Sequence, residues 1–407
     1  MQEVKLGTLT NRKIGYGIVQ PGNSVTNGVP VIKVNNILSG LRNVHDLDTT
    51  SIENDRKYSR TKLVGGELIV SVVGTIGKTA IVPQDFAGCN LVRATALIDI
   101  PDSLLTRWVK YYIDSPKGQH YISKNLNTTV QPTLNVKSLV EMPIPLYPTD
   151  YMMVATSTLA TLDDKIAVNK KICENLEAQA QALFKHWFVD FAPFKDGKFV
   201  ESELGLIPEG WRVVSLDEMT SKFGTGLNPR QNFKLGEGDN YYVTIKNMGN
   251  NRVYLDDRCD KVTDEAIEKI NKRSKLQKGD LLFSGIGTIG RVAMITETPT
   301  NWNTSESVFN MHPAEGYSTE FLYVLLLSDA FQQYVKIHAQ GGVQQGIRMA
   351  SLKQYLMPVP DHNTLKTFDD IIVPIISQIR EKDKENDYLA TLRDTLLPKL
   401  MSGQIKV

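Results

Sequence analysis

The chain has 407 residues, enough for two or three domains, and its 41% hydrophobic content can fill ordinary buried cores. No apolar run approaches the roughly 20 residues that cross a bilayer, and the polar segment 1–10 does not resemble a signal peptide, so we expect a cytoplasmic protein without membrane contact. The formal net charge of +1 neither indicates nor excludes a nucleic-acid partner, because phosphate binding depends on where Lys and Arg lie.

The chain contains an internal repeat whose copies lie 213 residues apart. Residues 66–82 read GELIVSVVGTIGKTAIV, and residues 279–295 read GDLLFSGIGTIGRVAMI. Val130-Gln131 and Val343-Gln344 match at the same offset, whereas residues 4–6 match 214–216, so small insertions separate the copies. A long repeat of this kind indicates two domains of one fold.

Each copy begins with short β-rich runs bounded by Gly, Pro and Asn and ends in a long helical stretch. We therefore predict two mixed α/β (α+β) globules, at residues 1–149 and 207–360. Pro-rich segments close both globules, because MPIPLYP precedes position 149 and MPVP ends at position 360. Residues 150–206 are expected to form a central helix and connector, and residues 361–407 a C-terminal helix.

Both helices carry apolar residues at alternating spacings of three and four, the pattern of a coiled-coil seam. The first seam comprises Leu159, Leu162, Ile166, Asn169, Cys173, Leu176, Ala180, Leu183 and Trp187. The second comprises Ile372, Ile375, Ile379, Lys382, Asn386, Leu389, Arg393, Leu396 and Leu400. Each helix could pack on its own globule, but the symmetry of the repeat favours mutual pairing as an antiparallel coiled coil.

A paired seam of about 28 residues would be roughly 42 Å long at ~1.5 Å per residue, and would hold the two globules near its opposite ends. Asn169 would fix the register at a cost in stability, whereas Lys382 would extend outwards or face a partner. The pattern therefore predicts two globules on a rigid spacer.

Motifs for catalysis and cofactor binding fail when the two copies are compared. The string GIGTIG at 285–290 fits a dinucleotide-binding pattern, but Val72 replaces Gly285 in the first copy and strand-like residues follow both copies. We therefore expect a β-hairpin turn. Gly77-Lys78-Thr79 resembles the end of a phosphate-binding loop, but Val72 also stands where its first glycine is required. The scattered histidines and distant cysteines (Cys89, Cys173, Cys259) do not form a metal site, so we predict no catalytic centre.

Basic and amide side chains recur near the GTIG segments and are the candidate contacts to DNA. Arg60 and Lys62 precede the first segment, and Arg273 and Lys275 precede the second; they form either a solvated face or a phosphate-binding surface. Loop residues that could contact bases are Lys33, Asn35, Asn36, Thr129 and Gln131 in the first copy and Lys246, Asn247, Gln344, Gln345 and Arg348 in the second. Asn and Gln can bind adenine and Arg can bind guanine, but these residues are also common in turns.

Three further segments complete the pattern: LATLDDKIAVNKKICENLEAQAQALFKHWFVDF at 159–191, IPEGW at 207–211 and LLPKLMSGQI at 396–405. With the duplicated globules and GTIG segments, they resemble the specificity (S) subunit of type I restriction-modification systems over essentially the whole chain. The resemblance implies that each globule is a target-recognition domain for one half of a split DNA target. The helices would set the spacer, about twelve base pairs centre to centre at ~3.4 Å per base pair.

The resemblance also implies partners. Two methyltransferase (M) subunits would bind the helices and modify adenine with S-adenosylmethionine, and restriction (R) subunits would add ATP- and Mg-dependent functions. This chain would bind double-stranded DNA, hold none of those cofactors and not be an enzyme. Two alternatives stay open: a specificity subunit of a methylation-only or type II-like system, and a coiled-coil scaffold whose globules bind proteins.

Overall fold

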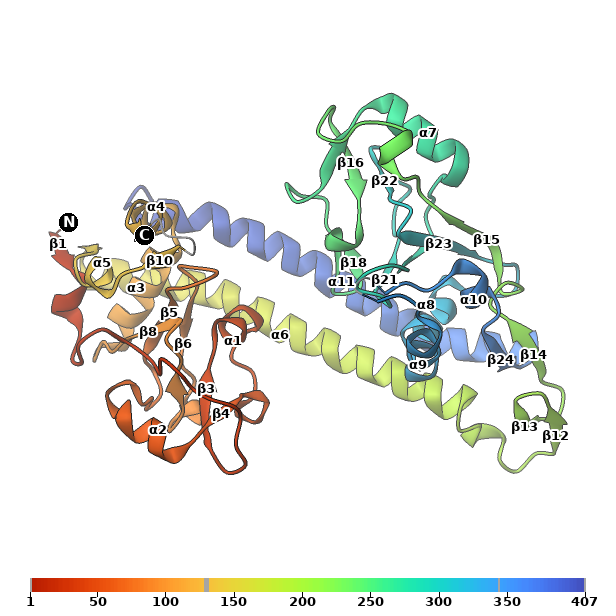
Figure 1. Cartoon of the computed structure of the whole chain (residues 1–407), viewed down its shortest axis with the longest axis horizontal. Helices are drawn as coiled ribbons and strands as arrows, with labels where there is room; N and C mark the ends of the chain where they lie inside the picture. The colour runs from red at the N-terminus through yellow and green to blue at the C-terminus, as the bar shows by residue number, and fades with distance from the viewer. Residues whose placement is uncertain (1, 128–131, 343–344, 406–407) are drawn as a thin grey trace. The chain divides into compact units, whose positions relative to one another are not determined.

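The computed structural model describes residues 2–127, 132–342 and 345–405, and divides into two compact units. Unit 1 comprises Met1–Val168 with Glu385–Val407, and unit 2 comprises Asn169–Lys384. Two 40-residue helices, α6 (Thr149–Phe188) and α11 (His362–Met401), contribute to both units (Figure 1). Their bounds differ by the 213 residues of the sequence repeat. Among the described residues, no helix has the length and apolarity needed to cross a membrane.

The globule of unit 1 is built on two small sheets. The first is antiparallel, with the order β2 (Gly15–Tyr16), β8 (Thr95–Ile98), β5 (Leu68–Ser71), β6 (Thr79–Ile81). The second has the order β4 (Thr49–Thr50), β3 (Val29–Ile32), β7 (Asn90–Leu91), with β3 and β7 parallel. The initial strand β1 (Gln2–Lys5) pairs with the last strand, β11 (Pro143–Leu146), and so closes the globule just before α6.

Helices cover the larger sheet of unit 1 and form its core. The helices of the globule are α1 (Val34–Ser39), α2 (Ile52–Lys57), α3 (Ser103–Asp114), α4 (Pro116–Lys124) and α5 (Val136–Val140), and a short pair joins β9 (Leu126–Asn127) to β10 (Thr133–Leu134). Asp102 begins α3 because its carboxylate accepts the backbone N–H groups of Leu104 and Leu105, at 2.7 and 3.0 Å. Trp108 is fully buried and donates its indole N–H to the Pro145 carbonyl at 2.7 Å, which ties α3 to β11.

Unit 2 repeats this architecture. Its first sheet has the order β15 (Thr220–Thr225), β23 (Val308–Pro313), β20 (Leu281–Ser284), β21 (Val292–Met294). Its second sheet has the order β19 (Asp260–Val262), β16 (Asn240–Val243), β22 (Trp302–Thr304), and β14 (Arg212–Ser215) pairs with β24 (Leu356–Val359). Its remaining elements are the hairpins β12 (Phe199–Ser202) with β13 (Gly205–Pro208) and β17 (Met248–Gly249) with β18 (Arg252–Val253), and the helices α7 (Asp264–Ser274), α8 (Thr319–Leu327), α9 (Asp329–His338) and α10 (Met349–Lys353). The predicted duplication of a mixed α/β domain is therefore confirmed.

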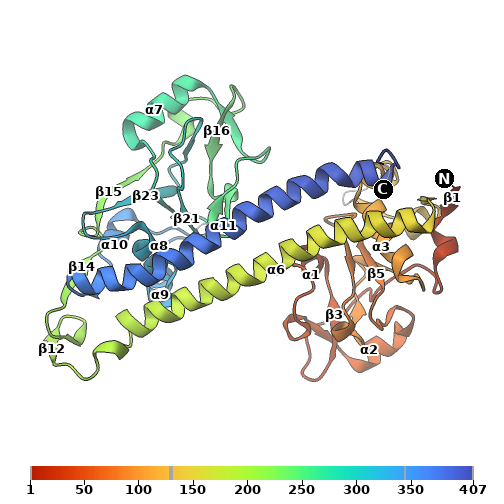
Figure 2. The same ribbon diagram turned by 180° about the vertical axis from the view of Figure 1, so that it is seen from behind.

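The long helices pack against each other within each unit, and both views show them side by side (Figure 2). In unit 1 the first half of α6 meets the last part of α11: Leu159 shares a core with Leu397, and the Tyr151 hydroxyl donates to the Leu400 carbonyl at 2.8 Å. In unit 2 the second half of α6 meets the first part of α11, where the ring centroids of Phe188 and Phe368 lie 4.8 Å apart. The helices therefore run antiparallel, as the seam pattern predicted.

The predicted seam positions all lie on the covered side of the helices. Nine are buried: Leu159, Ile166, Asn169, Cys173, Ala180, Ile372, Ile379, Asn386 and Leu400. Nine are half-buried: Leu162, Leu176, Leu183, Trp187, Ile375, Lys382, Leu389, Arg393 and Leu396. The helix is longer than the predicted seam, because α6 begins at Thr149 and buries Met152 and Ala155 in the core of the first globule.

Candidate nucleic-acid interface

The GTIG segments form the turns of two equivalent β-hairpins, which confirms the hairpin prediction. In unit 1, β5 pairs with β6, and the Ser71 hydroxyl accepts the Lys78 N–H at 2.8 Å while donating to the Thr75 carbonyl at 2.6 Å. In unit 2, β20 pairs with β21, and Ser284 makes the same two bonds to Arg291 and Thr288, at 2.8 and 2.7 Å. A strand serine therefore fixes each turn from inside.

Each turn is also tied to a helix, α4 in unit 1 and α9 in unit 2. The Gln119 side chain donates to the Gly77 carbonyl at 2.9 Å, and Gln332 donates to the Gly290 carbonyl at 3.0 Å. Gly77 and Gly290 have φ values of +81° and +93°, a left-handed conformation that glycine adopts without strain. The glycines therefore serve the turn, and a nucleotide-binding role is not needed to explain them.

The described residues that follow Val130-Gln131 and Val343-Gln344 in the chain lie beside the GTIG turns. In unit 1, Val73 forms a β-bridge with Thr133. In unit 2, Ile286 bridges Gly346, and the Gly287 N–H donates to the Gln345 carbonyl at 2.8 Å. The recurrent motifs therefore gather at one edge of each larger sheet. The candidate residues Thr129, Gln131 and Gln344 lie outside the described residues.

The four predicted phosphate contacts differ in their surroundings. Arg60 is exposed in a 3-10 turn (Ser59–Thr61) and forms no bond to any described residue. Lys62, in contrast, pairs at 2.6 Å with the buried carboxylate of Asp55. Arg273 lies in the last turn of α7 and donates to the Thr225 hydroxyl at 3.3 Å, and the Lys275 side chain is exposed. Arg60 and Lys275 can thus turn to an external anion more easily than Lys62.

The two lysines among the loop candidates form exposed ion pairs. Lys33 lies 2.5 Å from Asp48, and Lys246 lies 3.0 Å from Asp260. Such pairs contribute about 0–1 kcal/mol, so an external phosphate can compete for either lysine. Asn35, Gln345 and Arg348 are exposed, and their side chains form no bond to any described residue, so they are available to contact a base.

Asn36 and Asn247 have local structural roles. The Asn36 side chain accepts the Lys33 N–H at 2.7 Å at the start of α1, and the Asn247 side chain accepts the Thr244 N–H at 2.9 Å. Asn247 is also fully buried, so its amide cannot reach a base in this conformation. Both asparagines therefore match the turn interpretation of these residues better than the base-reading one.

A charged network joins the recognition domain of unit 1 to both long helices. Asp163 of α6 accepts the Tyr111 hydroxyl at 2.9 Å and pairs with Arg393 of α11 at 3.0 Å. Lys110 bridges Asp163 and Asp114 at 3.9 and 3.0 Å, and Asp114 accepts the Thr79 hydroxyl of β6 at 2.6 Å. A cavity of about 670 Å³ opens beside this network. The network thus connects the strand after the GTIG turn with the helix pair.

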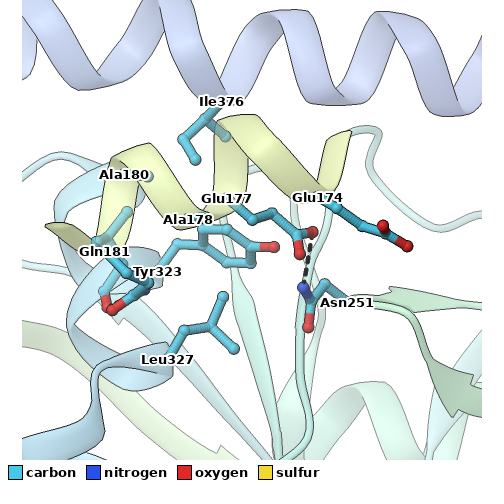
Figure 3. A pocket seen from close by; sticks show the side chains of 10 residues that line it. Glu174, Glu177, Ala178, Ala180, Gln181, Asn251, Tyr323, Leu327 and Ile376 are labelled. Carbon is cyan, nitrogen blue, oxygen red and sulfur yellow. Dashed lines mark hydrogen bonds between the residues drawn. The ribbon is translucent and has the colours of Figure 1, made fainter. Parts of the chain in front are cut away.

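In unit 2 a cavity of about 370 Å³ lies between α6, α8, α11 and the β17–β18 turn (Figure 3). The Asn251 side chain reaches into it and donates to Glu177 at 3.1 Å. Burial raises the pKa of Glu177, and the nearby Asp383 and Glu174 act in the same direction. Tyr323 and Leu327 form its wall. Glu174 also lines the cavity, so two carboxyl groups border it. No cluster of metal-ligating side chains occurs in the described part of the chain.

Comparison with known proteins identifies the class to which this arrangement belongs. The family model described as the type I restriction modification DNA specificity domain matches residues 1–178 and again residues 208–389. The chain belongs to this family. Its members are DNA-recognition subunits. The two matches cover both halves of the chain, which agrees with the duplicated globules.

Individual relatives support the assignment. The type I restriction enzyme MjaIX specificity subunit of Methanocaldococcus jannaschii is 23% identical over 309 residues, 75% of this chain and 70% of that protein. The HindI specificity subunit of Haemophilus influenzae is 26% identical over 308 residues, 61% of this chain and 65% of that protein. The crystal structure of the type I S subunit from M. genitalium has the same fold, with a TM-score of 0.52 at 14% identity, and covers 98% of this chain and 95% of that one. The chain is therefore a DNA target-recognition subunit and not itself an enzyme.

Proposed function

We propose that the chain directs a type I restriction-modification complex to a bipartite DNA target. The domains at 1–149 and 207–360 each read one half-site, and the antiparallel helices set the spacer between them. The observation that carries this proposal is the repetition of one sheet order in two units, each packed on the same pair of helices. The loop residues of the two units differ, so the half-sites differ and the target is asymmetric.

The DNA contacts proposed for this function are the exposed residues at the sheet edges. Arg60, Arg273 and Lys275 approach phosphates, and Lys33 and Lys246 join them when their surface ion pairs open. Base contacts come from Asn35, Gln345 and Arg348, together with Thr129, Gln131 and Gln344. Asn36, Asn247 and Lys62 are not retained, because their side chains already serve the fold.

Partner subunits complete the proposed complex. Each unit exposes apolar side chains on a long helix: Met153 and Val154 on α6 in unit 1, and Ile371 and Val373 on α11 in unit 2. One such surface on each unit fits two M subunits, which would supply S-adenosylmethionine chemistry. R subunits with bound ATP and Mg would join them. A cytoplasmic location is part of this proposal, because the complex acts on DNA.

A footprint of the assembled complex tests the proposal. The chain is purified with M subunits and bound to a library of DNA fragments, and protected fragments are sequenced. Two short protected sequences at a fixed separation are expected. Protection without sequence preference, from a complex that is otherwise intact, would contradict the proposal and favour a protein-binding scaffold.

A heptad insertion tests the spacer. Seven residues are added to α6 after Val168 and seven to α11 after Lys384, so that both helices lengthen together at the boundary of the units. Seven residues at ~1.5 Å add about 10 Å, or about three base pairs at ~3.4 Å each. The preferred gap is expected to grow by about three base pairs. An unchanged gap would exclude the helices as the spacer.

A further inference from the structure

A small cavity in unit 1 opens beside the GTIG turn. It has a volume of about 320 Å³ and is lined by Ile18, Val19, Pro21, Val73, Val92, Arg93, Ala94 and Thr133. Val73 comes from the GTIG hairpin, Thr133 from β10, and Arg93 from the turn between β7 and β8. The cavity therefore lies where the recurrent motifs of this unit meet, and Arg93 is its single charged residue.

The backbone of Arg93 is held rigidly while its side chain is free. Its N–H donates to the Ile18 carbonyl at 2.7 Å, and the Val92 N–H donates to the Ile32 carbonyl at 3.2 Å. The Thr95 hydroxyl closes the turn by donating to the Val92 carbonyl at 2.8 Å. The exposed Arg93 guanidinium forms neither a hydrogen bond nor an ion pair with any residue in 2–127, 132–342 or 345–405. The N–H groups of the Arg93 guanidinium are therefore exposed to solvent on a turn whose backbone is held in place.

The equivalent position in unit 2 has the opposite charge and a structural role. Glu306 stands 213 residues after Arg93; its carboxylate accepts the Asn228 amide at 2.7 Å and the Tyr242 hydroxyl at 3.3 Å. The matching strand registers, Val31 with Asn90 and Tyr242 with Asn303, place Val31 where Tyr242 lies. Val31 carries no hydroxyl group to take the part of Tyr242, and the Arg93 side chain has no partner among the described residues.

We propose that Arg93 determines the specificity of the first recognition domain by donating two hydrogen bonds to a guanine base. This inference rests on the proposed function. The planar guanidinium matches the O6 and N7 acceptors of guanine in the major groove. Val19, which is 47% exposed beside it, supplies an apolar surface for a neighbouring thymine methyl group. The fixed turn adds to selectivity, because little conformational freedom remains to be lost on binding.

The test compares Arg93→Gln and Arg93→Lys in the complex with M subunits, by selection from a randomised target library. Arg93→Gln is expected to reduce the preference for one guanine, in one half-site only, by about 5- to 150-fold. Arg93→Lys keeps the charge but lacks the planar fork, so binding strength is retained while the preference falls. Arg107→Gln, which removes an exposed arginine from α3, is the matched control and leaves the motif unchanged.

Salt dependence separates base reading from phosphate binding. A uniform loss of affinity across all sequences in Arg93→Gln, with a shallower dependence on salt, would identify a phosphate contact and overturn the inference. An unchanged motif would overturn it as well, as would full recovery of the preference in Arg93→Lys. If the wild-type complex itself lacks sequence preference, the proposed function fails. If the wild-type complex is selective and Arg93→Gln has the same sequence preference, only the Arg93 inference fails.

Discussion

Phe368 of α11 is expected to be the residue on which unit 2 depends most strongly for its stability. Its side chain is fully buried, and its ring lies 4.8 Å from Phe188, 5.7 Å from Trp187 and 6.1 Å from Phe321. These contacts join α6, α8 and α11 in one cluster. Removing the ring in Phe368→Ala leaves a cavity that three elements surround and cannot easily close. The expected loss is about 3–5 kcal/mol in the free energy of unfolding.

Urea denaturation followed by tryptophan fluorescence measures this loss, because Trp187, Trp211 and Trp302 all lie in unit 2 and only Trp108 lies in unit 1. Ile337→Ala is the control, since Ile337 is a 76% exposed apolar residue of α9 in the same unit and its truncation should change stability by no more than about 0.5 kcal/mol. A loss below about 1.5 kcal/mol in Phe368→Ala would refute the reasoning, because it would mean that the ring is not packed as described.

Three further changes address other parts of the molecule. Asp163→Asn removes the carboxylate opposite Arg393 and should lower the free energy of unfolding of unit 1 by about 1–3 kcal/mol, seen as a lower urea midpoint. An unchanged midpoint would contradict a bridging role. Gly290→Ala brings a Cβ into contact with the Gln332 side chain at a φ of +93° and should lower the free energy of unfolding by about 1–2 kcal/mol in a thermal melt. Gly342→Ala is the control, because a Cβ there meets no described atom within 4 Å. Glu177→Gln should stabilise the fold at pH 8, since burial raises the pKa of this carboxyl and penalises its ionised form; the gain should vanish near pH 4, and equal melting temperatures at pH 8 would contradict it.

The features that the sequence predicted are local and periodic. The hairpins follow from GTIG between β-rich runs, and the paired helices follow from seam positions such as Leu159 and Ile372, whose spacing is independent of distant contacts. The seam begins at Leu159 although α6 begins at Thr149, because Met152 and Ala155 pack into the core of the globule. A heptad pattern reports only the residues that face the partner helix.

The roles of individual polar residues could not be read in the same way. Lys62 resembled a phosphate contact until the fold placed it 2.6 Å from the buried Asp55. Asn247 was a candidate base contact, but it is buried, and its side chain accepts the Thr244 N–H at the start of a short turn (Ile245–Asn247). Arg93 carried no signal, because the second copy has Glu306 at its position and a repeat comparison favours residues that recur. Tertiary contacts decide which polar side chains are free.

The most direct test of the central claim is single-molecule sequencing of DNA from cells that express this chain with its cognate methyltransferase subunit, scored for modified adenines. The account predicts a split motif with modified adenines on both strands, which disappears when this chain is omitted. Adenine modification that is identical with and without the chain, in cells where the two proteins form a stable complex, would contradict its role in DNA target recognition.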